Sequence, residues 1–296
     1  MSVYPFIEAE KVEHRNVAKA CGLLEVSRSA FYAWHQHTPS DRAVADLALL
    51  ERITQVHEDS RGIYGSPRVH RELARQGVCV RRERVARIMR QEGLVGCAPR
   101  RWITTTLSDP TVVGQDLLKR NFAPDSVDLD RVYVGDITYI RTWEGWLYLA
   151  TVIDLASRRV VGWAMADHMS ASLVCDALRM AVQHRRPAPG AMFHSDRGSQ
   201  YTSHDFRALL GEHEMVQSLS RPRQCWDNAV AESFFASLKM ECIYRQSWAT
   251  RTQVRRAVFD YIEVFYNRAR LHSAIGYCPP AEHEAKLHHH TTAEAA

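Results

Sequence analysis

The 296-residue sequence lacks the features that mark membrane, secreted and disulfide-bonded proteins. No apolar run reaches the length of about 18 residues that a membrane-spanning helix needs. The first residues have no apolar segment behind a basic start, so we expect no signal peptide. The seven cysteines are an odd number without a Cys-x-x-Cys pair, which argues against a disulfide framework and a structural zinc ribbon. We therefore expect a reducing, cytoplasmic compartment.

The composition is that of a folded protein. Hydrophobic residues make up 46% of the chain and charged residues 24%, which leaves room for only short disordered segments. The length corresponds to about one to three domains. Internal repeats and sustained heptads are absent from the sequence, so no coiled coil is expected within it.

Positive charge is concentrated in one segment. Residues 61–101 contain 11 Lys and Arg against 3 Asp and Glu, a local balance of +8, whereas the net charge of the whole chain is +4. Lys and Arg that neutralise phosphates release condensed counterions, so such a segment favours a polyanionic partner. On charge alone, a nucleic acid and a solvated helix surface remain equally open.

The first part of the sequence is expected to be helical. Residues 16–36 have the pattern of two short helices and a turn, with Ser27 as the second N-cap, although Glu25 stands where glycine is usual. We assign this small helix-turn-helix to residues 1–40 and a basic helical domain, also helix-turn-helix-like, to residues 41–97. The last helix of this domain has an apolar stripe surrounded by arginines. This pattern suits a helix in a DNA groove or, alternatively, a solvated surface. The arginines are Arg81, Arg82, Arg84, Arg87 and Arg90.

A different pattern begins at Arg131. Three strand-like runs follow one another, and then helices and short strands alternate, which is the element order of a ribonuclease H-like α/β domain. The sequence therefore predicts a linker over 98–127, a ribonuclease H-like catalytic core over 128–245, a C-terminal helical extension over 246–286 and a disordered tail over 287–296.

Three acids stand on or beside these elements. Asp136 lies within the first strand, Asp196 ends a later strand, and Glu232 lies one turn into a helix. Three carboxylates brought together raise one another's pKa values, and a divalent cation with hard oxygen ligands, Mg²⁺ or Mn²⁺, resolves that repulsion. Taken singly, Asp136 could instead pair with an arginine, Asp196 could be a turn residue, and Glu232 could favour the helix dipole.

Two neighbouring polar residues are expected to have no catalytic role. Ser195 follows His194, but no third partner that would orient a nucleophile is evident. Asp154 is expected to be structural and to pair with Arg158 or Arg159.

The motifs around the acids resemble those of a known family. VGDITYI, HSDRGSQYTS and CWDNAVAESFFASLK resemble the catalytic core of bacterial insertion-sequence transposases; 35 residues separate Asp196 from Glu232, and Lys239 lies seven residues beyond Glu232. RGIYGSPRVHREL and YIEVFYNRARLHSAIGYCPPAEHE resemble the family's helix-turn-helix segment and C-terminal signature. Over about residues 14–285 the chain is similar to the insertion-sequence-three family, OrfB-type, with a DDE integrase-like catalytic core. Gly135 departs from the family pattern, in which threonine is common.

This resemblance implies a DNA transposase, a polynucleotidyl transferase that nicks terminal inverted repeats and joins the 3′-OH to DNA by in-line transesterification. Asp136, Asp196 and Glu232 would be catalytic and would hold two Mg²⁺ or Mn²⁺ ions per active site. Contacts to DNA would come from a wider set, namely Arg61, Tyr64, Arg68, Arg81, Arg82, Arg84, Arg87, Arg221, Asn228 and Lys239.

The resemblance also implies the partners. These would be terminal-repeat and target DNA, further copies of the chain in a homo-oligomer on DNA, and an upstream-frame protein or fusion partner. The protein would work in the bacterial cytoplasm at the nucleoid, without a membrane.

Two other functions stay open. A non-catalytic DNA-binding regulator derived from a transposase would keep the helical region, but the intact acids argue against it. A ribonuclease H or junction resolvase would share the acids without the basic N-terminal segment or the helix that carries Glu232 and Lys239. Salt- and metal-dependent cleavage of inverted-repeat DNA separates the three.

Overall fold

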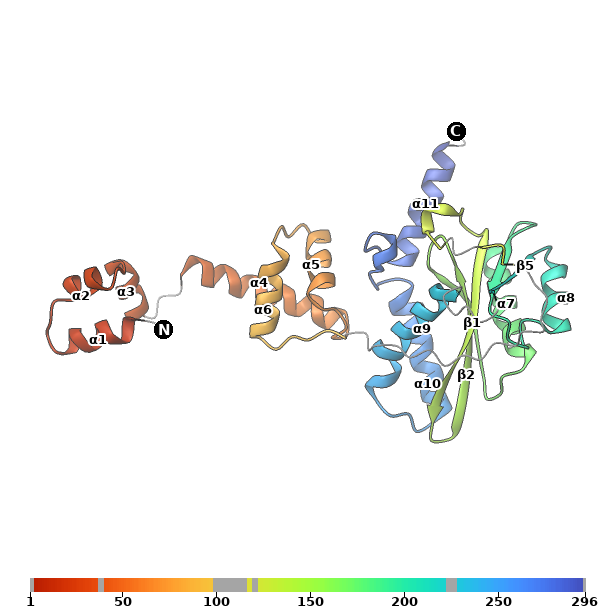
Figure 1. Ribbon diagram of the computed structural model, residues 1–296, viewed down its shortest axis with the longest axis horizontal. Helices are drawn as coiled ribbons and strands as arrows, with labels where there is room; N and C mark the ends of the chain where they lie inside the picture. Colours follow the sequence, from red (N-terminus) through yellow and green to blue (C-terminus); the bar gives the residue numbers. More distant parts are fainter. Residues whose placement is uncertain (1–2, 37–39, 98–115, 119–121, 222–227, 295–296) are drawn as a thin grey trace. The chain divides into compact units, whose positions relative to one another are not determined.

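The computed structural model describes residues 3–36, 40–97, 116–118, 122–221 and 228–294. The chain divides into two compact units, Met1–Val95 and Gly96–Ala296 (Figure 1). Among the helices of these described ranges, none has both the length and the apolar character needed to cross a membrane.

The first unit begins with three short helices, α1 (Tyr4–Val12), α2 (Val17–Leu23) and α3 (Arg28–His35). They enclose a small core made by Ile7, Cys21 and Phe31. The Ser27 hydroxyl caps α3, as predicted, by accepting a hydrogen bond from the backbone N–H of Ala30 at 3.5 Å. Glu25 adopts a φ of 52° in the turn, so a residue with a side chain takes the left-handed conformation that usually falls to glycine.

Three further helices make up the basic part of this unit: α4 (Asp41–Asp59), α5 (Ser66–Arg75) and α6 (Arg82–Gln91). α5 and α6 bury one apolar stripe each, and their side chains are Val69, Leu73, Val85, Ile88 and Met89. Because these stripes occupy one face of each helix, the arginines of α6 are left on the remaining faces.

The second unit is built on a five-stranded sheet in the order β3-β2-β1-β4-β5. β1 (Val132–Thr142), β2 (Gly145–Asp154) and β3 (Val160–Ala166) are antiparallel neighbours. β4 (Met192–Ser195) and β5 (Val216–Leu219) continue the sheet in parallel with β1. This topology confirms the predicted ribonuclease H-like α/β core.

Helices cover both faces of this sheet (Figure 1). α7 (Ala171–Arg185) and α8 (His204–Glu212) lie on one face over a core that includes Tyr133, Phe193 and Phe206. α9 (Ala229–Glu241) contacts β1 and α10 (Arg251–Phe259) contacts β2 on the other face. Side chains at alternate positions of β1 therefore serve two different layers.

A buried ion pair fastens the end of α9 to the C-terminal extension. Two guanidinium nitrogens of Arg270 donate to the two carboxylate oxygens of Glu241 at 2.7 Å each, and the Tyr261 hydroxyl donates to the same carboxylate at 2.7 Å. The side chains of Arg270 and Glu241 are 4% and 5% exposed. Arg270 follows a π-helical turn, η4 (Asp260–Tyr266), that continues from α10.

Two sequence predictions need correction here. The predicted linker is packed against the core at its described end: the Leu117 N–H donates to the Ser218 hydroxyl at 3.0 Å, and Leu118 is 6% exposed. Residues 98–115 of that linker lie outside the described residues. The predicted disordered tail is wrong up to Glu294, because α11 (Pro280–Glu294) continues through it.

The Arg270–Glu241 pair gives a stability prediction. Arg270→Met should lower the free energy of unfolding by about 3–5 kcal/mol, because it leaves the Glu241 charge buried without its partner. Urea denaturation monitored by circular dichroism measures this loss, and Arg268→Met, at an exposed position two residues away, is the matched control. A loss below about 1 kcal/mol would show that the pair is not a stabilising brace.

Candidate functional site

The sheet brings Asp136 and Asp196 side by side. β1 and β4 run in parallel with Val134 opposite His194, so two further steps along each strand place Asp136 level with Asp196. Neighbouring strands lie about 4.8 Å apart, so two carboxyl groups at the same level are close neighbours. β4 ends at Ser195, and among the described residues no strand pairs with the β1 edge beyond this point on that side.

Burial and like charge dominate the electrostatics of this pair. Burial and the neighbouring Asp196 charge raise the pKa of Asp136 well above its usual range, and Glu232 adds to that rise. Burial also raises the pKa of Asp196. One backbone N–H supports each carboxylate: Ile137 donates to Asp136 at 2.8 Å, and Gly198 donates to Asp196 at 3.0 Å. Two such bonds leave the repulsion largely uncompensated.

α9 carries Glu232 and Lys239 to the same neighbourhood. Glu232 lies half-buried in the first turn of this helix, and burial raises the pKa of its carboxyl. Burial lowers the pKa of the Lys239 ammonium, whereas the Asp136 charge raises it. In turn Lys239 favours ionised Asp136. The structure therefore brings Asp196, Glu232 and Lys239 within electrostatic reach of Asp136.

Asn228 ties the start of α9 to the strand that holds Asp136. Its side-chain amide donates to the Gly135 carbonyl at 3.3 Å, and the residue is 5% exposed. This corrects the prediction that Asn228 contacts DNA, because the side chain is buried between α9 and β1. Gly135 fits this packing, since a Cβ there would lie 2.4 Å from the Phe193 ring and that ring would have to move.

Three buried polar atoms near Asp136 have no hydrogen-bond partner among the described residues. They are the Thr151 hydroxyl, the Tyr201 hydroxyl and the Asn228 side-chain oxygen. Thr151 is the cross-strand partner of Asp136 and shares its face of the sheet. Burial raises the pKa of Tyr201 well above its usual value, and the charges of Asp136 and Asp196 raise it further. Buried polar groups of this kind are normally satisfied by protein or water, so these three atoms are candidate partners for water or a hydrated ligand.

These donors fit a hydrated divalent cation better than any apolar ligand. Mg²⁺ is bound through one or two carboxylates and several waters, which is what two adjacent aspartates and three unpaired polar atoms offer. In the part of the chain described here, no cluster of three His, Cys, Asp or Glu side chains stands close enough to hold a metal ion by itself. Asp136 and Asp196 are thus an adjacent pair of carboxylates, and Glu232 is on the neighbouring helix α9.

The other two polar residues near the site have structural partners. His194 is fully buried and its Nδ1 lies 2.8 Å from the Ser218 hydroxyl, while the Ser195 hydroxyl donates to the Asp196 carbonyl at 3.1 Å. Asp154 is structural, as predicted, but its partners differ: it accepts bonds from the Ser157 N–H at 2.7 Å and the Asp130 N–H at 3.0 Å.

The predicted DNA contacts of α6 divide into two groups. Arg81 and Arg82 are exposed at the start of the helix. Arg84 and Arg87 instead bind the two oxygens of Asp46 on α4, at 2.7 and 2.6 Å. The hydrogen bonds from Arg87 and then from Arg84 lower the pKa of Asp46. Sequence reasoning missed Asp46, because 38 residues separate it from Arg84.

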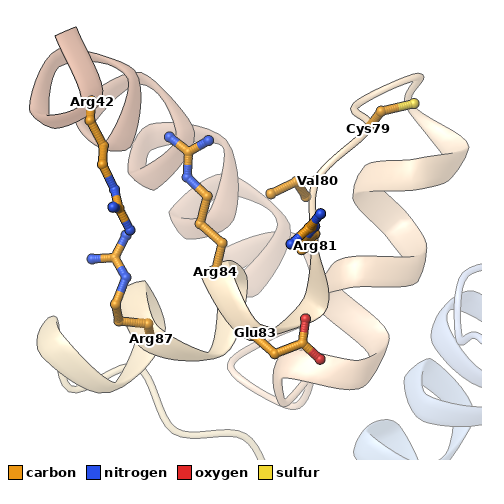
Figure 2. A pocket seen from close by; sticks show the side chains of 7 residues that line it. All are labelled: Arg42, Cys79, Val80, Arg81, Glu83, Arg84 and Arg87. Atoms are coloured by element: carbon orange, nitrogen blue, oxygen red, sulfur yellow. The ribbon is translucent and has the colours of Figure 1, made fainter.

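A basic pocket of about 540 Å³ opens beside these arginines. Figure 2 shows the guanidinium groups of Arg42 and Arg87 pointing toward each other, with Arg84 beside them. Converging guanidinium groups of this kind suit an anionic ligand such as a phosphate. Its lining residues are Arg42, Cys79, Val80, Arg81, Glu83, Arg84 and Arg87.

The remaining predicted contacts have mixed outcomes. Arg61 is exposed, and Arg68 is half-buried with its guanidinium 5.8 Å from the Tyr64 ring. The prediction that Tyr64 contacts DNA is wrong, because this residue is only 3% exposed and packs in the core of the helices. Arg221 is 47% exposed and lies 3.5 Å from Asp116, so its charge is partly balanced within the protein.

Known proteins combine the same two regions. The family described as integrase core domain matches residues 129–225, a second integrase core family matches residues 213–280, and the family described as HTH-like domain matches residues 45–102. An insertion element IS600 uncharacterized 31 kDa protein of Shigella sonnei is 39% identical over 269 residues, which cover 90% of this chain and 98% of that protein. Transposase InsF for insertion sequence IS3A of Escherichia coli (strain K12) is 40% identical over 290 residues, which cover 96% of this chain and 98% of that protein.

One solved structure with a partial likeness is the catalytic core domain of BIV integrase. It is 16% identical and covers 55% of this chain and 99% of that chain, at a TM-score of 0.39.

The raised pKa of Asp136 predicts how stability depends on pH. The folded protein binds more protons than the unfolded chain above the ordinary carboxyl pKa of 3.8, so its free energy of unfolding falls as pH rises through that window. Asp136→Asn removes this loss. Without metal, the variant should therefore be more stable than the wild type at neutral pH, by about 1.4 kcal/mol for each unit by which folding raises the pKa of Asp136. Thermal unfolding in chelator, from acid to neutral pH, measures it.

Two comparisons complete this experiment. The exposed Asp128→Asn variant is the control for loss of a carboxylate elsewhere in the same unit. Added Mn²⁺ should stabilise the wild type more than Asp136→Asn. Equal stability of wild type and Asp136→Asn in chelator at every pH would show that Asp136 carries no repulsion to relieve.

Proposed function

Because the chain belongs to the family of insertion-sequence IS3 transposases, we propose that it is a DNA transposase that cleaves element ends and joins their 3′-OH groups to DNA. The observation that carries this proposal is the adjacent, mutually repelling pair Asp136 and Asp196 with Glu232 in electrostatic reach. A carboxylate pair held at raised pKa in a polar pocket is typical of a cation-binding catalytic site. A non-catalytic regulator would have no use for it.

Asp136 and Asp196 would hold the divalent cations, Mg²⁺ or Mn²⁺ and two in number, and Glu232 would complete their ligands from α9. When bound, the cations would activate the attacking water or 3′-OH and offset charge on the leaving oxygen. Thr151, Tyr201 and the Asn228 side-chain oxygen would hydrogen-bond the waters that complete a cation's shell, because each lacks a partner among the described residues. Such outer contacts fix the orientation of carboxylate ligands.

Lys239 and the helical unit would hold the DNA. The Lys239 ammonium lies beside Asp136 and would contact a phosphate next to the scissile bond. In the first unit, exposed Arg81 and Arg82 and the basic pocket would bind the backbone of a terminal repeat. Target DNA, further copies of this chain and an upstream-frame protein are the partners we propose, on DNA in the bacterial cytoplasm.

The catalytic assignment predicts the effect of Glu232→Gln. Glutamine keeps the length and helix propensity of glutamate, and the apolar face of α9 does not use this side chain, so fold and DNA binding should persist. Cleavage and joining should fall by roughly three orders of magnitude or more, because a cation ligand and its charge are lost. Joining of a labelled terminal-repeat duplex in Mg²⁺, beside a gel-shift assay, measures both.

Glu212→Gln, at the exposed end of α8, is the control for this substitution. Wild-type rates of joining by Glu232→Gln would overturn the triad. Loss of DNA binding together with joining would mean that Glu232 serves the structure instead.

The basic helix predicts a change in salt dependence. Arg82→Ala should weaken binding to duplex DNA at low salt and reduce the slope of log K against log salt by about 0.9, because one DNA phosphate is no longer neutralised by the protein. Fluorescence anisotropy over a salt series measures this slope. Arg179→Ala on α7, an exposed arginine of the other unit, should leave the slope unchanged. An unchanged slope for Arg82→Ala would make this arginine part of a solvated surface.

A further inference from the structure

The outer half of the β1–β2 hairpin carries large exposed aromatic side chains. Trp143 is 80% exposed, Tyr139 is 55% exposed and Trp146 is 45% exposed. Figure 1 shows this end of the two strands next to α10. Exposed aromatic groups gathered on one element usually mark a contact surface and not a packing need.

Tyr139 and Trp146 form one surface, which we call the aromatic platform. In the β1–β2 register Tyr139 is opposite Tyr148, and Arg141 is opposite Trp146, so all four side chains are on the same face of the sheet. The Tyr139 and Trp146 rings meet edge to face, with centroids 5.2 Å apart. Exposed Arg141 is on the rim of the same face.

Hydrogen bonds tie the hairpin to the start of α10, which restricts the backbone that carries the platform. The Arg251 guanidinium donates to the Trp146 carbonyl at 3.1 Å, and the Arg251 N–H donates to the Glu144 carboxylate at 2.8 Å. The Trp143 N–H donates to the Trp248 carbonyl at 3.1 Å. Rigid aromatic groups lose little conformational entropy when they bind, which favours their use in recognition.

Lys239 joins the platform to the catalytic carboxylates. Its ammonium lies 5.4 Å from the centroid of the Tyr139 ring, and its charge also acts on Asp136. Tyr139 is three residues beyond Asp136 on β1, roughly 10 Å along the strand, and its side chain is on the opposite face of the sheet. Lys239 is therefore the group that links the platform to the catalytic carboxylates.

We propose that the aromatic platform stacks an unpaired nucleobase of the DNA strand whose phosphate lies at the catalytic carboxylates. The inference rests on the proposed function. Aromatic rings beside a tracking cation are the elements that bind single-stranded nucleic acid, because every base has a face that can stack and every nucleotide has a phosphate. Arg141 and Lys239 supply the positive charge around the rings. Bases within an intact duplex are stacked on each other, so the platform selects an unpaired end.

Binding without metal tests the platform apart from catalysis. The probe is a terminal-repeat duplex with a short unpaired 3′ tail that carries 2-aminopurine, compared with the same duplex fully paired, in chelator. Trp146→Ala and Tyr139→Ala should each weaken binding of the tailed duplex by about 5- to 150-fold and leave the paired duplex unaffected. Trp146→Phe should keep most of the affinity. The alanine variants should lose the quenching of 2-aminopurine fluorescence, because the ring that stacks on the base is removed.

The control is Phe259→Ala on α10, an equally exposed aromatic (53%) whose ring contacts Trp163 instead of the platform. Circular dichroism shows whether each variant is folded. If an alanine variant does not fold, the test relies on Trp146→Phe, which keeps an aromatic ring at the same position. Equal affinity of wild type and Trp146→Ala for the tailed duplex overturns the platform. A shift from dimer to monomer in sedimentation, with tail affinity unchanged, overturns it as well and assigns the surface to a second copy of the chain.

Failure of the proposed function has a different signature. A wild-type protein that binds the tailed duplex but neither cleaves nor joins it in Mg²⁺ contradicts the transposase proposal and leaves the platform standing. A wild-type protein that cleaves while its platform variants bind normally contradicts the platform alone.

Discussion

The repulsion between Asp136 and Asp196 is the constraint on which the rest of the second unit depends. The register of β1 and β4 brings the two carboxylates together, and burial together with like charge raises the pKa of Asp136. Such an arrangement costs free energy in the absence of a cation. The cost is offset by apolar burial on both faces of the sheet, above all by the aromatic core around Phe193 and Phe206. A site that is unfavourable by itself is therefore supported by the packed aromatic core of the same sheet.

α9 is the second element of this arrangement, and it is fastened at both ends. Asn228 bonds to the strand beside Asp136 at its start, and Glu241 is held by Arg270 of the C-terminal extension at its end. Between these two fixed points the helix carries Glu232 and Lys239. The C-terminal extension thus influences the site indirectly, because it helps to fix the position of α9 relative to Asp136 and Asp196.

The sequence predicted the features that depend on local pattern and missed those that depend on register or distant contacts. The helical first unit and the alternation of strands and helices after Arg131 follow from local periodicity, and the three acids were found from the sequence motifs around them. α1 was missed because it has a single buried residue, Ile7, which packs in a core with Cys21 of α2 and Phe31 of α3. Thr151 and Tyr201 reach Asp136 through strand pairing and folding that no spacing reveals. Tyr64 was misassigned because a tyrosine among arginines suggests a DNA contact until its burial is known.

The first unit brings like-charged guanidinium groups together, as the second unit brings like-charged carboxylates together. Three guanidinium groups converge at the basic pocket, and Asp46 neutralises part of their charge through Arg84 and Arg87. A phosphate that binds there would replace or join a carboxylate already in place, so its net electrostatic gain is smaller than at an exposed arginine. Arg84 and Arg87 would accordingly fix the position and orientation of DNA, whereas Arg81 and Arg82, exposed at the start of α6, would supply more of the salt-dependent affinity.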